Sequence, residues 1–166
     1  MSLYVSAYGL SFKRCMTYWG MAVMAALFAF AAGKLARPER SVVVLTGDGE
    51  QLMGLGALAT IGAQRPPNLT VVVLDNGRYG ETGMQESHTS LGTSLAEVAR
   101  ACGFAWAEEV TEPRGALRLA EKVRARDGCG LAQVLVRAEA LPRTLPPRDG
   151  RWLKERFRAA LAVSSP

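Results

Sequence analysis

The sequence predicts a doubly wound α/β fold with a mainly parallel sheet. Two short runs of β-branched and apolar residues, SVVVLT (41–46) and LTVVVL (69–74), are continuous enough to be strands buried on both faces. Between them, residues 50 to about 64 carry apolar side chains at mixed three- and four-residue spacings, as a helix does. Strand, helix and strand in this order form a βαβ unit, in which the helix crosses between two parallel strands.

The alternation of helix and strand continues after residue 90. Ser94 and Glu97 have the spacing of a capping box, so we expect a helix from there to about Cys102, before Gly103. The later elements are expected to be a short strand in FAWAEEV (104–110), a helix from Thr111-Glu112-Pro113 to about Arg126, a strand in LAQVLVR (131–137), a proline-rich loop (142–150) and a terminal helix from Trp152 to Ala162. In a sheet of this kind, ligands bind at the carboxyl ends of the strands.

An uncharged stretch near the amino end allows three interpretations. Residues 15–33 contain no charged side chain, which is nearly a membrane-spanning length, and Lys13-Arg14 before them resembles the start of a signal peptide. We favour a buried helix over about 21–35, ended by Pro38, because a cytosolic-looking α/β pattern follows. Its alanines would let another helix approach closely, so we expect an oligomer and no membrane partner.

Charge and cysteine content narrow the class of protein further. The net charge of +5 comes from 20 basic and 15 acidic side chains and is too small to argue for nucleic acid. The cysteines at 15, 102 and 129 are far apart and form no CxxC pair, which is typical of reduced thiols in a cytoplasmic protein. His88 is the single histidine, so a site with several histidine ligands is excluded within this chain.

Two loops at strand ends carry oxygen ligands suited to a hard cation. Gly47-Asp48-Gly49 follows the first strand, and Asn76 lies in the loop 75–90 that follows the second. A carboxylate, an amide oxygen and a backbone carbonyl, completed by water or phosphate, suit Mg²⁺. Phosphate could lie against the amides of Gly49 and Glu50, where the absence of a side chain at Gly49 removes an obstacle. The alternative is an ordinary Asp-Gly turn beside an ordinary Asn-Gly turn.

The spacing of these loops resembles the signature of thiamine diphosphate enzymes. In this sequence Gly47-Asp48-Gly49 is followed by 25 residues and then Asp75-Asn76. The resemblance implies that Asp48, Asn76 and the main-chain carbonyl of Arg78 bind Mg²⁺. It also implies that the pair Tyr79-Gly80 lines the cofactor. Residues 20 to about 162 are similar to the beta subunit of sulfopyruvate decarboxylase and to phosphonopyruvate decarboxylases, with a diphosphate-binding domain over 20–166 and an atypical segment over 1–19.

The chain departs from the family pattern at several positions. Asp75 replaces the first asparagine of the signature, and Glu50 stands where many relatives have serine, so we expect only the backbone amide of Glu50 to contribute. Trp19 occupies the position of the bulky apolar residue that holds the cofactor bent, with Gly20 beside it and Thr17 in place of a glycine. The first strand and helix of the family are expected to be short or absent.

The resemblance implies a subunit of a 2-oxo acid decarboxylase that needs a partner. In this family a glutamate on a separate pyrimidine-binding domain activates the cofactor, and 166 residues leave no room for that domain. A pyrimidine-domain (alpha) subunit is therefore expected, in a homo- or hetero-oligomer acting on a small 2-oxo acid. Glu81, Glu86 and His88 are candidate proton relays or, equally, solvated loop residues.

Two other classes of function stay open. One is the beta subunit of a thiamine diphosphate-dependent oxidoreductase or of an acetolactate synthase-like enzyme; the lack of an iron–sulfur cysteine motif counts against electron acceptance in this chain. The other is a non-catalytic cofactor-binding remnant, which Thr17 and Trp19 favour. A partner chain that carries the catalytic glutamate would separate a subunit from a remnant.

Overall fold

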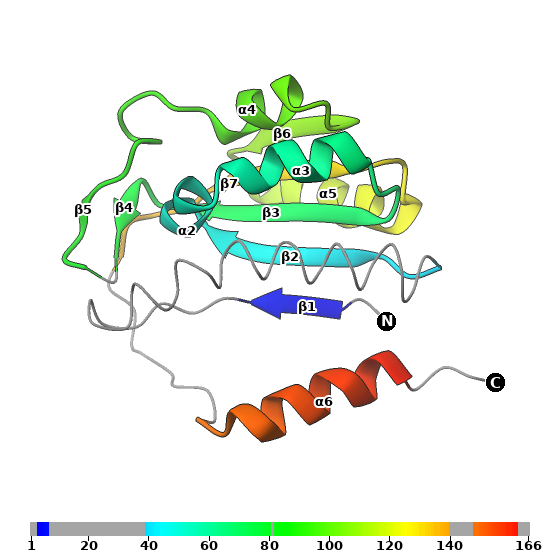
Figure 1. The fold of residues 1–166 in the computed structure, drawn as a ribbon. Coiled ribbons are helices and arrows are strands. Elements are labelled where there is room, and N and C mark those ends of the chain that lie inside the picture. Colours follow the sequence, from blue (N-terminus) through cyan, green and yellow to red (C-terminus); the bar gives the residue numbers. More distant parts are fainter. Residues whose placement is uncertain (1–2, 7–38, 81, 140–147, 163–166) are drawn as a thin grey trace.

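A five-stranded parallel sheet forms the centre of the molecule (Figure 1). The computed structural model describes residues 3–6, 39–80, 82–139 and 148–162. The strand order is β1-β2-β3-β7-β6, and every neighbouring pair runs parallel. The strands are β1 (Leu3–Ser6), β2 (Val42–Gly47), β3 (Leu69–Asp75), β7 (Gly130–Leu135) and β6 (Trp106–Val110).

Helices cover both faces of this sheet, which confirms the doubly wound prediction. The helices are α2 (Asp48–Met53), α3 (Gly56–Gln64), α4 (Leu95–Ala101), α5 (Pro113–Ala125) and α6 (Gly150–Ala162). One face packs against α3 and α4 through a cluster that includes Leu58, Leu95 and Val71. The other face packs against α5 through Leu119 and Val72. Since Val71 and Val72 are consecutive, their side chains point to opposite faces of β3, as the pleat requires.

The prediction of a single helix over 50–64 is wrong in detail, because two helices, α2 and α3, cross between β2 and β3. The first runs from Asp48 to Met53, and its C-cap residue is Gly54, whose amide bonds to the Glu50 carbonyl at 3.1 Å. Leu55 then caps the second helix. Glycine is a poor residue for a helix interior, so the break falls where the chain has the most backbone freedom.

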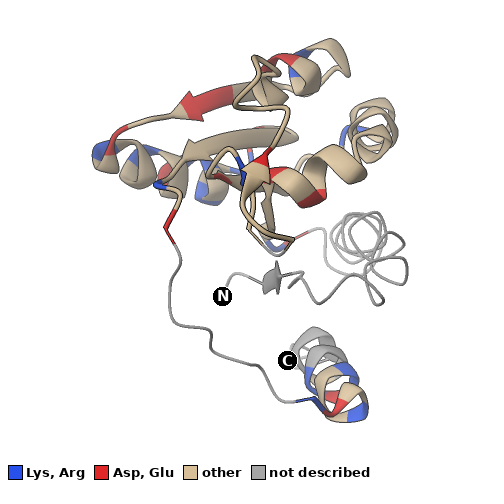
Figure 2. Ribbon diagram, turned by 90° about the vertical axis from the view of Figure 1, so that its left-hand side faces the viewer, with Lys and Arg blue, Asp and Glu red and all other residues tan. Residues whose placement is uncertain are grey.

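The helices and strands predicted after residue 90 are confirmed, with boundaries shifted by a few residues, whereas most of the proline-rich loop predicted over 142–150 lies outside the described residues. Ser94 caps α4 by accepting a hydrogen bond from the Glu97 amide at 3.2 Å. α5 begins at Pro113, as the sequence predicts, and ends where Arg126 adopts a left-handed conformation. α6 carries several exposed basic residues (Figure 2): Arg151, Lys154 and Arg156. The antiparallel pair β4 (Arg78–Tyr79) and β5 (Gln85–Glu86) was not expected.

The amino-terminal predictions are tested only in part. A short first strand is present, since β1 pairs with β2 from Leu3 opposite Val42 to Ser6 opposite Leu45. The buried helix predicted over 21–35, together with Trp19 and Gly20, lies outside the described residues. Within the described ranges, no helix is long and apolar enough to cross a membrane.

Candidate functional site

The candidate residues gather at the carboxyl edge of the sheet. Asp48 is the first residue of α2 and follows β2 directly, while Asn76 follows β3. Gly47 is paired with Leu74 in the register of these two parallel strands, so the loops that follow them begin side by side. Figure 1 shows α2, β4 and β5 at the same end of the sheet. The two loops selected from the sequence therefore share one edge.

Asp48 is a buried carboxylate with neutral partners. Its side chain is only 2% exposed. Its Oδ2 accepts a hydrogen bond from Ser87 Oγ at 2.5 Å and lies 3.3 Å from Thr89 Oγ1. Within the described part of the chain, no basic side chain contacts Asp48, and its Oδ1 accepts no hydrogen bond. Charges buried in proteins are normally paired or bound to a metal ion, and none of the residues that the structure describes supplies such a partner to this carboxylate.

Asp75, at the end of β3, is a second buried carboxylate and is fully engaged. Its Oδ1 accepts hydrogen bonds from the Gly77 amide at 2.9 Å and from Thr89 Oγ1 at 2.8 Å. Its Oδ2 accepts one from Gln133 Nε2 at 2.6 Å. The residue that departs from the family signature is thus tied to three donors, and Thr89 joins it to Asp48.

Three residues of this site were missed by the sequence analysis. Ser87 and Thr89 contact Asp48 from 39 and 41 residues away, and no local pattern indicates such a contact. Gln133 did leave a signal, because it is a polar residue inside the apolar strand β7. A buried polar side chain in a strand needs partners, and that requirement could have identified it.

Contacts with neighbouring residues explain the positions of Gly49 and Glu50, the two residues after Asp48. The Glu50 carboxylate turns back to accept hydrogen bonds from Thr46 Oγ1 at 3.0 Å and from the Gly47 amide at 3.4 Å, which is half of a capping box. Gly49 lies against the Tyr79 ring, since a Cβ there would be 2.7 Å from Tyr79 Cδ1. The missing side chain at Gly49 therefore makes room for an aromatic ring, a reason that the sequence did not reveal.

The loop after β3 makes tight turns at Asn76 and Arg78, whose side-chain amide oxygen and main-chain carbonyl oxygen are the expected ligands. Asn76 Oδ1 accepts a hydrogen bond from the Arg78 amide at 2.9 Å. The Arg78 carbonyl accepts one from the Gly80 amide at 3.1 Å. Each of these oxygens has a second lone pair and can still bind a cation. The Arg78 guanidinium pairs with Glu86 at 3.3 Å, across the β4–β5 pair.

The candidate proton relays lie in different surroundings. Glu86 is exposed and engaged by the Arg78 guanidinium. His88 is exposed too, with its Nδ1 3.3 Å from the Tyr79 hydroxyl. Glu81 lies outside the described residues. No group of three or more His, Cys, Asp or Glu side chains that could hold a metal ion occurs in the part searched, so a cation here would also need amide, carbonyl or external oxygens.

A concavity of about 420 Å³ lies at the opposite, amino edge of the sheet. Its lining includes Arg65, Phe104 and Cys129. Burial raises the pKa of the Cys129 thiol to about 12, which keeps it protonated at neutral pH. This concavity has no part in the site at the carboxyl edge.

A parallel sheet with polar loops at its carboxyl edge defines an α/β ligand-binding domain. The family is shown by the sequence itself: the chain belongs to the C-terminal thiamine pyrophosphate-binding domains of thiamine pyrophosphate enzymes, whose family model matches residues 2–134. The resemblance inferred from the signature is thereby confirmed.

Two curated relatives agree with this membership. The sulfopyruvate decarboxylase subunit beta of Methanocaldococcus jannaschii is 48% identical over 66 residues, which are 40% of this chain and 35% of that protein. The phosphonopyruvate decarboxylase of Streptomyces viridochromogenes is 34% identical over 147 residues, 86% of this chain and 36% of that protein. The chain thus spans about a third of the length of these relatives.

One solved structure with a similar fold is that of a 2-oxoglutarate:ferredoxin oxidoreductase from Magnetococcus marinus. It superimposes with a TM-score of 0.61 at 19% identity, covering 86% of this chain and 57% of that one. At this identity the likeness supports the fold alone.

Proposed function

We propose that this chain is the Mg²⁺- and thiamine diphosphate-binding subunit of a 2-oxo acid decarboxylase similar to sulfopyruvate and phosphonopyruvate decarboxylases. The observation that carries the proposal is the Asp48 carboxylate, 2% exposed and bonded to hydroxyl groups. An uncompensated buried charge costs several kcal/mol even after local relaxation. A divalent cation beside Asp48 would offset that cost, which gives the site a physical reason to bind metal.

The donor set at the carboxyl edge fits Mg²⁺. Asp48, Asn76 and the Arg78 carbonyl offer hard oxygen atoms, the kind that this ion prefers over nitrogen or sulfur. Water and diphosphate oxygens would complete the coordination. The amides of Gly49 and Glu50 lie in the first turn of α2, where the positive end of the helix dipole favours an anion, and we propose that they hold the diphosphate. Because the Glu50 carboxylate is turned toward Thr46, its charge is already engaged.

Thiamine diphosphate, when bound, supplies the electron sink for loss of CO₂ from a 2-oxo acid. The residues of this chain would bind and orient it. Tyr79, with Gly80 after it, packs closely on Gly49 and places its hydroxyl 3.3 Å from His88 Nδ1. We therefore favour His88 over Glu86 as the group that exchanges a proton near the site, because Glu86 is paired with Arg78. Trp19 and Gly20 are proposed to approach the cofactor from the amino-terminal segment.

The proposal requires a second chain. The curated relative from Methanocaldococcus jannaschii is named as a beta subunit, which supports a separate alpha chain with a pyrimidine-binding domain and its glutamate. That assembly would be a cytoplasmic oligomer. The free thiols at Cys102 and Cys129 suit a reducing compartment.

Reconstitution tests the proposal. The chain is mixed with a pyrimidine-domain chain, Mg²⁺ and thiamine diphosphate, and CO₂ release is measured with sulfopyruvate, phosphonopyruvate and pyruvate. We expect turnover by the mixture and none by either chain alone. Ordinary enzymatic turnover by this chain alone would contradict the two-chain proposal. Turnover that requires an added electron acceptor would instead favour the oxidoreductase class, and cofactor binding without turnover of any 2-oxo acid would favour a remnant.

A further inference from the structure

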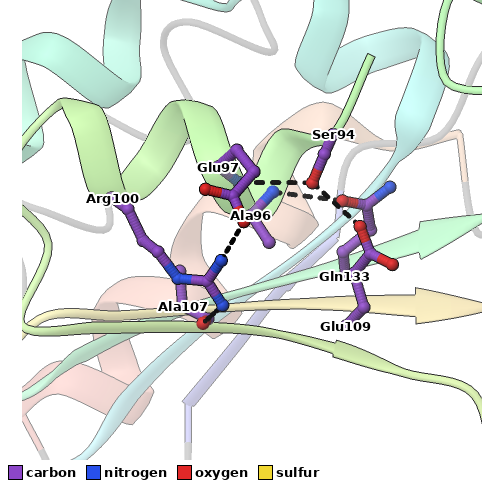
Figure 3. Close-up of polar contacts among 7 residues, drawn as sticks. All are labelled: Ser94, Ala96, Glu97, Arg100, Ala107, Glu109 and Gln133. Atoms are coloured by element: carbon purple, nitrogen blue, oxygen red, sulfur yellow. Dashed lines mark hydrogen bonds and ion pairs between the residues drawn. The ribbon is translucent and has the colours of Figure 1, made fainter. Parts of the chain in front are cut away.

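A chain of polar contacts leads from helix α4 to the Asp48 carboxylate. The amide of Ala96, in the first turn of α4, donates to Gln133 Oε1 at 3.1 Å (Figure 3). Gln133 Nε2 donates to Asp75, and Thr89 Oγ1 bonds the other oxygen of Asp75. Thr89 Oγ1 lies 2.8 Å from Ser87 Oγ, which in turn contacts Asp48. This chain of contacts links α4, β7, β3 and the loop around residues 87–89 to the Asp48 carboxylate.

The α4 end of this network is rigidly placed. Ser94 Oγ caps the helix and also bonds Glu109 of β6 at 2.8 Å. Arg100, six residues later, bonds the carbonyl of Ala107 in the same strand (Figure 3). Two contacts to β6 thus fix the helix along its length, so the amide that meets Gln133 has a defined position.

The hydroxyl groups near Asp48 contact only one of its two carboxylate oxygens. Both Ser87 and Thr89 approach Oδ2, whereas Oδ1 accepts no hydrogen bond from any residue that the structure describes. Each hydroxyl carries a single hydrogen. The shortest contact of Ser87 to a carboxylate goes to Asp48, and that of Thr89 goes to Asp75. One oxygen of Asp48 is therefore held in place, which leaves the other available to a cation.

The hydrogen-bond acceptors of Asp75 match the donors of Gln133 in only one orientation of the Gln133 amide group. Gln133 uses its oxygen on the Ala96 amide, so its NH₂ group must face Asp75. Asp75 accepts all three of its hydrogen bonds, which a carboxylate can do. An asparagine at position 75 would have a single acceptor oxygen. Its NH₂ group would then face one of the donors that now bond the Asp75 carboxylate. The aspartate at this signature position is thus matched to the glutamine on β7.

We propose that Ser87 and Thr89 are positioning residues, anchored by the Asp75–Gln133 pair, that orient the Asp48 carboxylate to receive a divalent cation. This inference rests on the proposed function, because it concerns the same metal site. Partners in the outer shell of metal ligands typically change metal affinity by about 10- to 100-fold. We expect a loss in that range when a hydroxyl is removed.

The first test removes single hydroxyl groups. Thr89→Val and Ser87→Ala are compared with Thr82→Val, whose hydroxyl lies in the same loop but bonds Gln85 at 2.9 Å. Calorimetry measures the affinity of the full chain for thiamine diphosphate in excess Mg²⁺, and thermal unfolding in EDTA monitors folding. We expect the first two variants to lose about 10- to 100-fold in affinity. Thr82→Val and the hydroxyl-retaining Thr89→Ser should bind as wild type does.

The second test exchanges donors and acceptors. Asp75→Asn and Gln133→Glu each create a mismatch, whereas the double variant restores complementarity with the same net charge. In the double variant, the new amide on β3 would donate to the new carboxylate on β7, and the amide oxygen would remain for Thr89 and the Gly77 amide. Both single variants should lower the urea midpoint in EDTA and weaken cofactor binding. The double variant should recover most of both losses.

Two results would separate failure of this inference from failure of the proposed function. Wild type and Asp48→Ala binding thiamine diphosphate equally in Mg²⁺ would overturn the metal site itself. Binding that depends on Asp48 but is unchanged in Ser87→Ala and Thr89→Val would overturn the positioning role alone. A double variant no better than the sum of the two single variants would overturn the Asp75–Gln133 anchor, whichever result the binding assay gives.

Discussion

Asp48→Asn should stabilise the metal-free protein while abolishing its response to Mg²⁺. The substitution keeps the shape of the side chain and removes a charge that is 2% exposed. Its amide oxygen can still accept from Ser87 and Thr89, which contact only one of the two carboxylate oxygens. The substitution therefore changes mainly the charge, and the contacts of Asp48 determine how that change affects the free energy of unfolding.

The opposing contributions leave a small net gain. Relieving the desolvation of a buried carboxylate contributes several kcal/mol, taken as about 4. Weakening the charge-assisted hydrogen bond from Ser87 and the longer Thr89 contact costs about 2 kcal/mol together, and the new amide N–H groups cost about 1 kcal/mol. The net is a stabilisation of about 1 kcal/mol, or roughly 2–4 °C in Tm for a chain of this size.

Thermal unfolding in EDTA, and again with Mg²⁺ and thiamine diphosphate, measures this prediction. Ligands present at about 100 times their Kd stabilise a protein by about 2.7 kcal/mol, so the order of wild type and Asp48→Asn should reverse when both are added. Asp48→Ala is the control, because it removes the acceptor of the short Ser87 hydrogen bond and leaves a cavity at a buried position, so it should be less stable than either. A lower Tm for Asp48→Asn in EDTA would show that the charge is already compensated within the chain, and the argument for a cation would fail.

Three further predictions concern packing and reactivity. Gly49→Ala places a Cβ 2.7 Å from the Tyr79 ring, so the ring must move; calorimetry should show weaker thiamine diphosphate binding with little change in Tm, and unchanged affinity would remove Tyr79 from the site. Gly62→Ala brings a Cβ to 1.9 Å from the Cys102 carbonyl oxygen, where backbone must shift, so urea unfolding should show a loss of about 1–3 kcal/mol; wild-type stability would contradict this packing of α3 on α4. Burial raises the pKa of the Cys129 thiol to about 12 and leaves it 1% exposed, so it should resist iodoacetamide in the native protein at neutral pH while the less buried Cys102 reacts. Peptide mass mapping that finds the two equally alkylated would refute this.

The strands and most helices were predictable because their signals are local. β2 and β3 are continuous β-branched runs, and α5 begins at a proline that pre-sets the helical φ angle. The break at Gly54 was missed because the apolar spacing continues through it. The β4–β5 pair could not be predicted, since strands of two residues show no periodicity.

The site was predictable where the signature is local and not where contacts are distant. Gly47 to Gly49 and Asn76 follow strands in the sequence, so the edge that they share could be deduced. Ser87 and Thr89 reach Asp48 only because the loop folds back, and that path depends on tertiary contacts. The Asp75–Gln133 pair joins residues 58 apart, and the hydrogen-bond match between them becomes visible only with both strands in register.

Mg²⁺-dependent binding of thiamine diphosphate tests the central claim most directly. Calorimetric titrations of the assembled protein, in Mg²⁺ and in EDTA, compare wild type with Asp48→Ala and Asn76→Ala. We expect binding by wild type in Mg²⁺, none in EDTA, and none by either variant, with all three proteins folded. Undiminished binding in EDTA or in either variant would contradict the assignment of this edge of the sheet as the metal and diphosphate site.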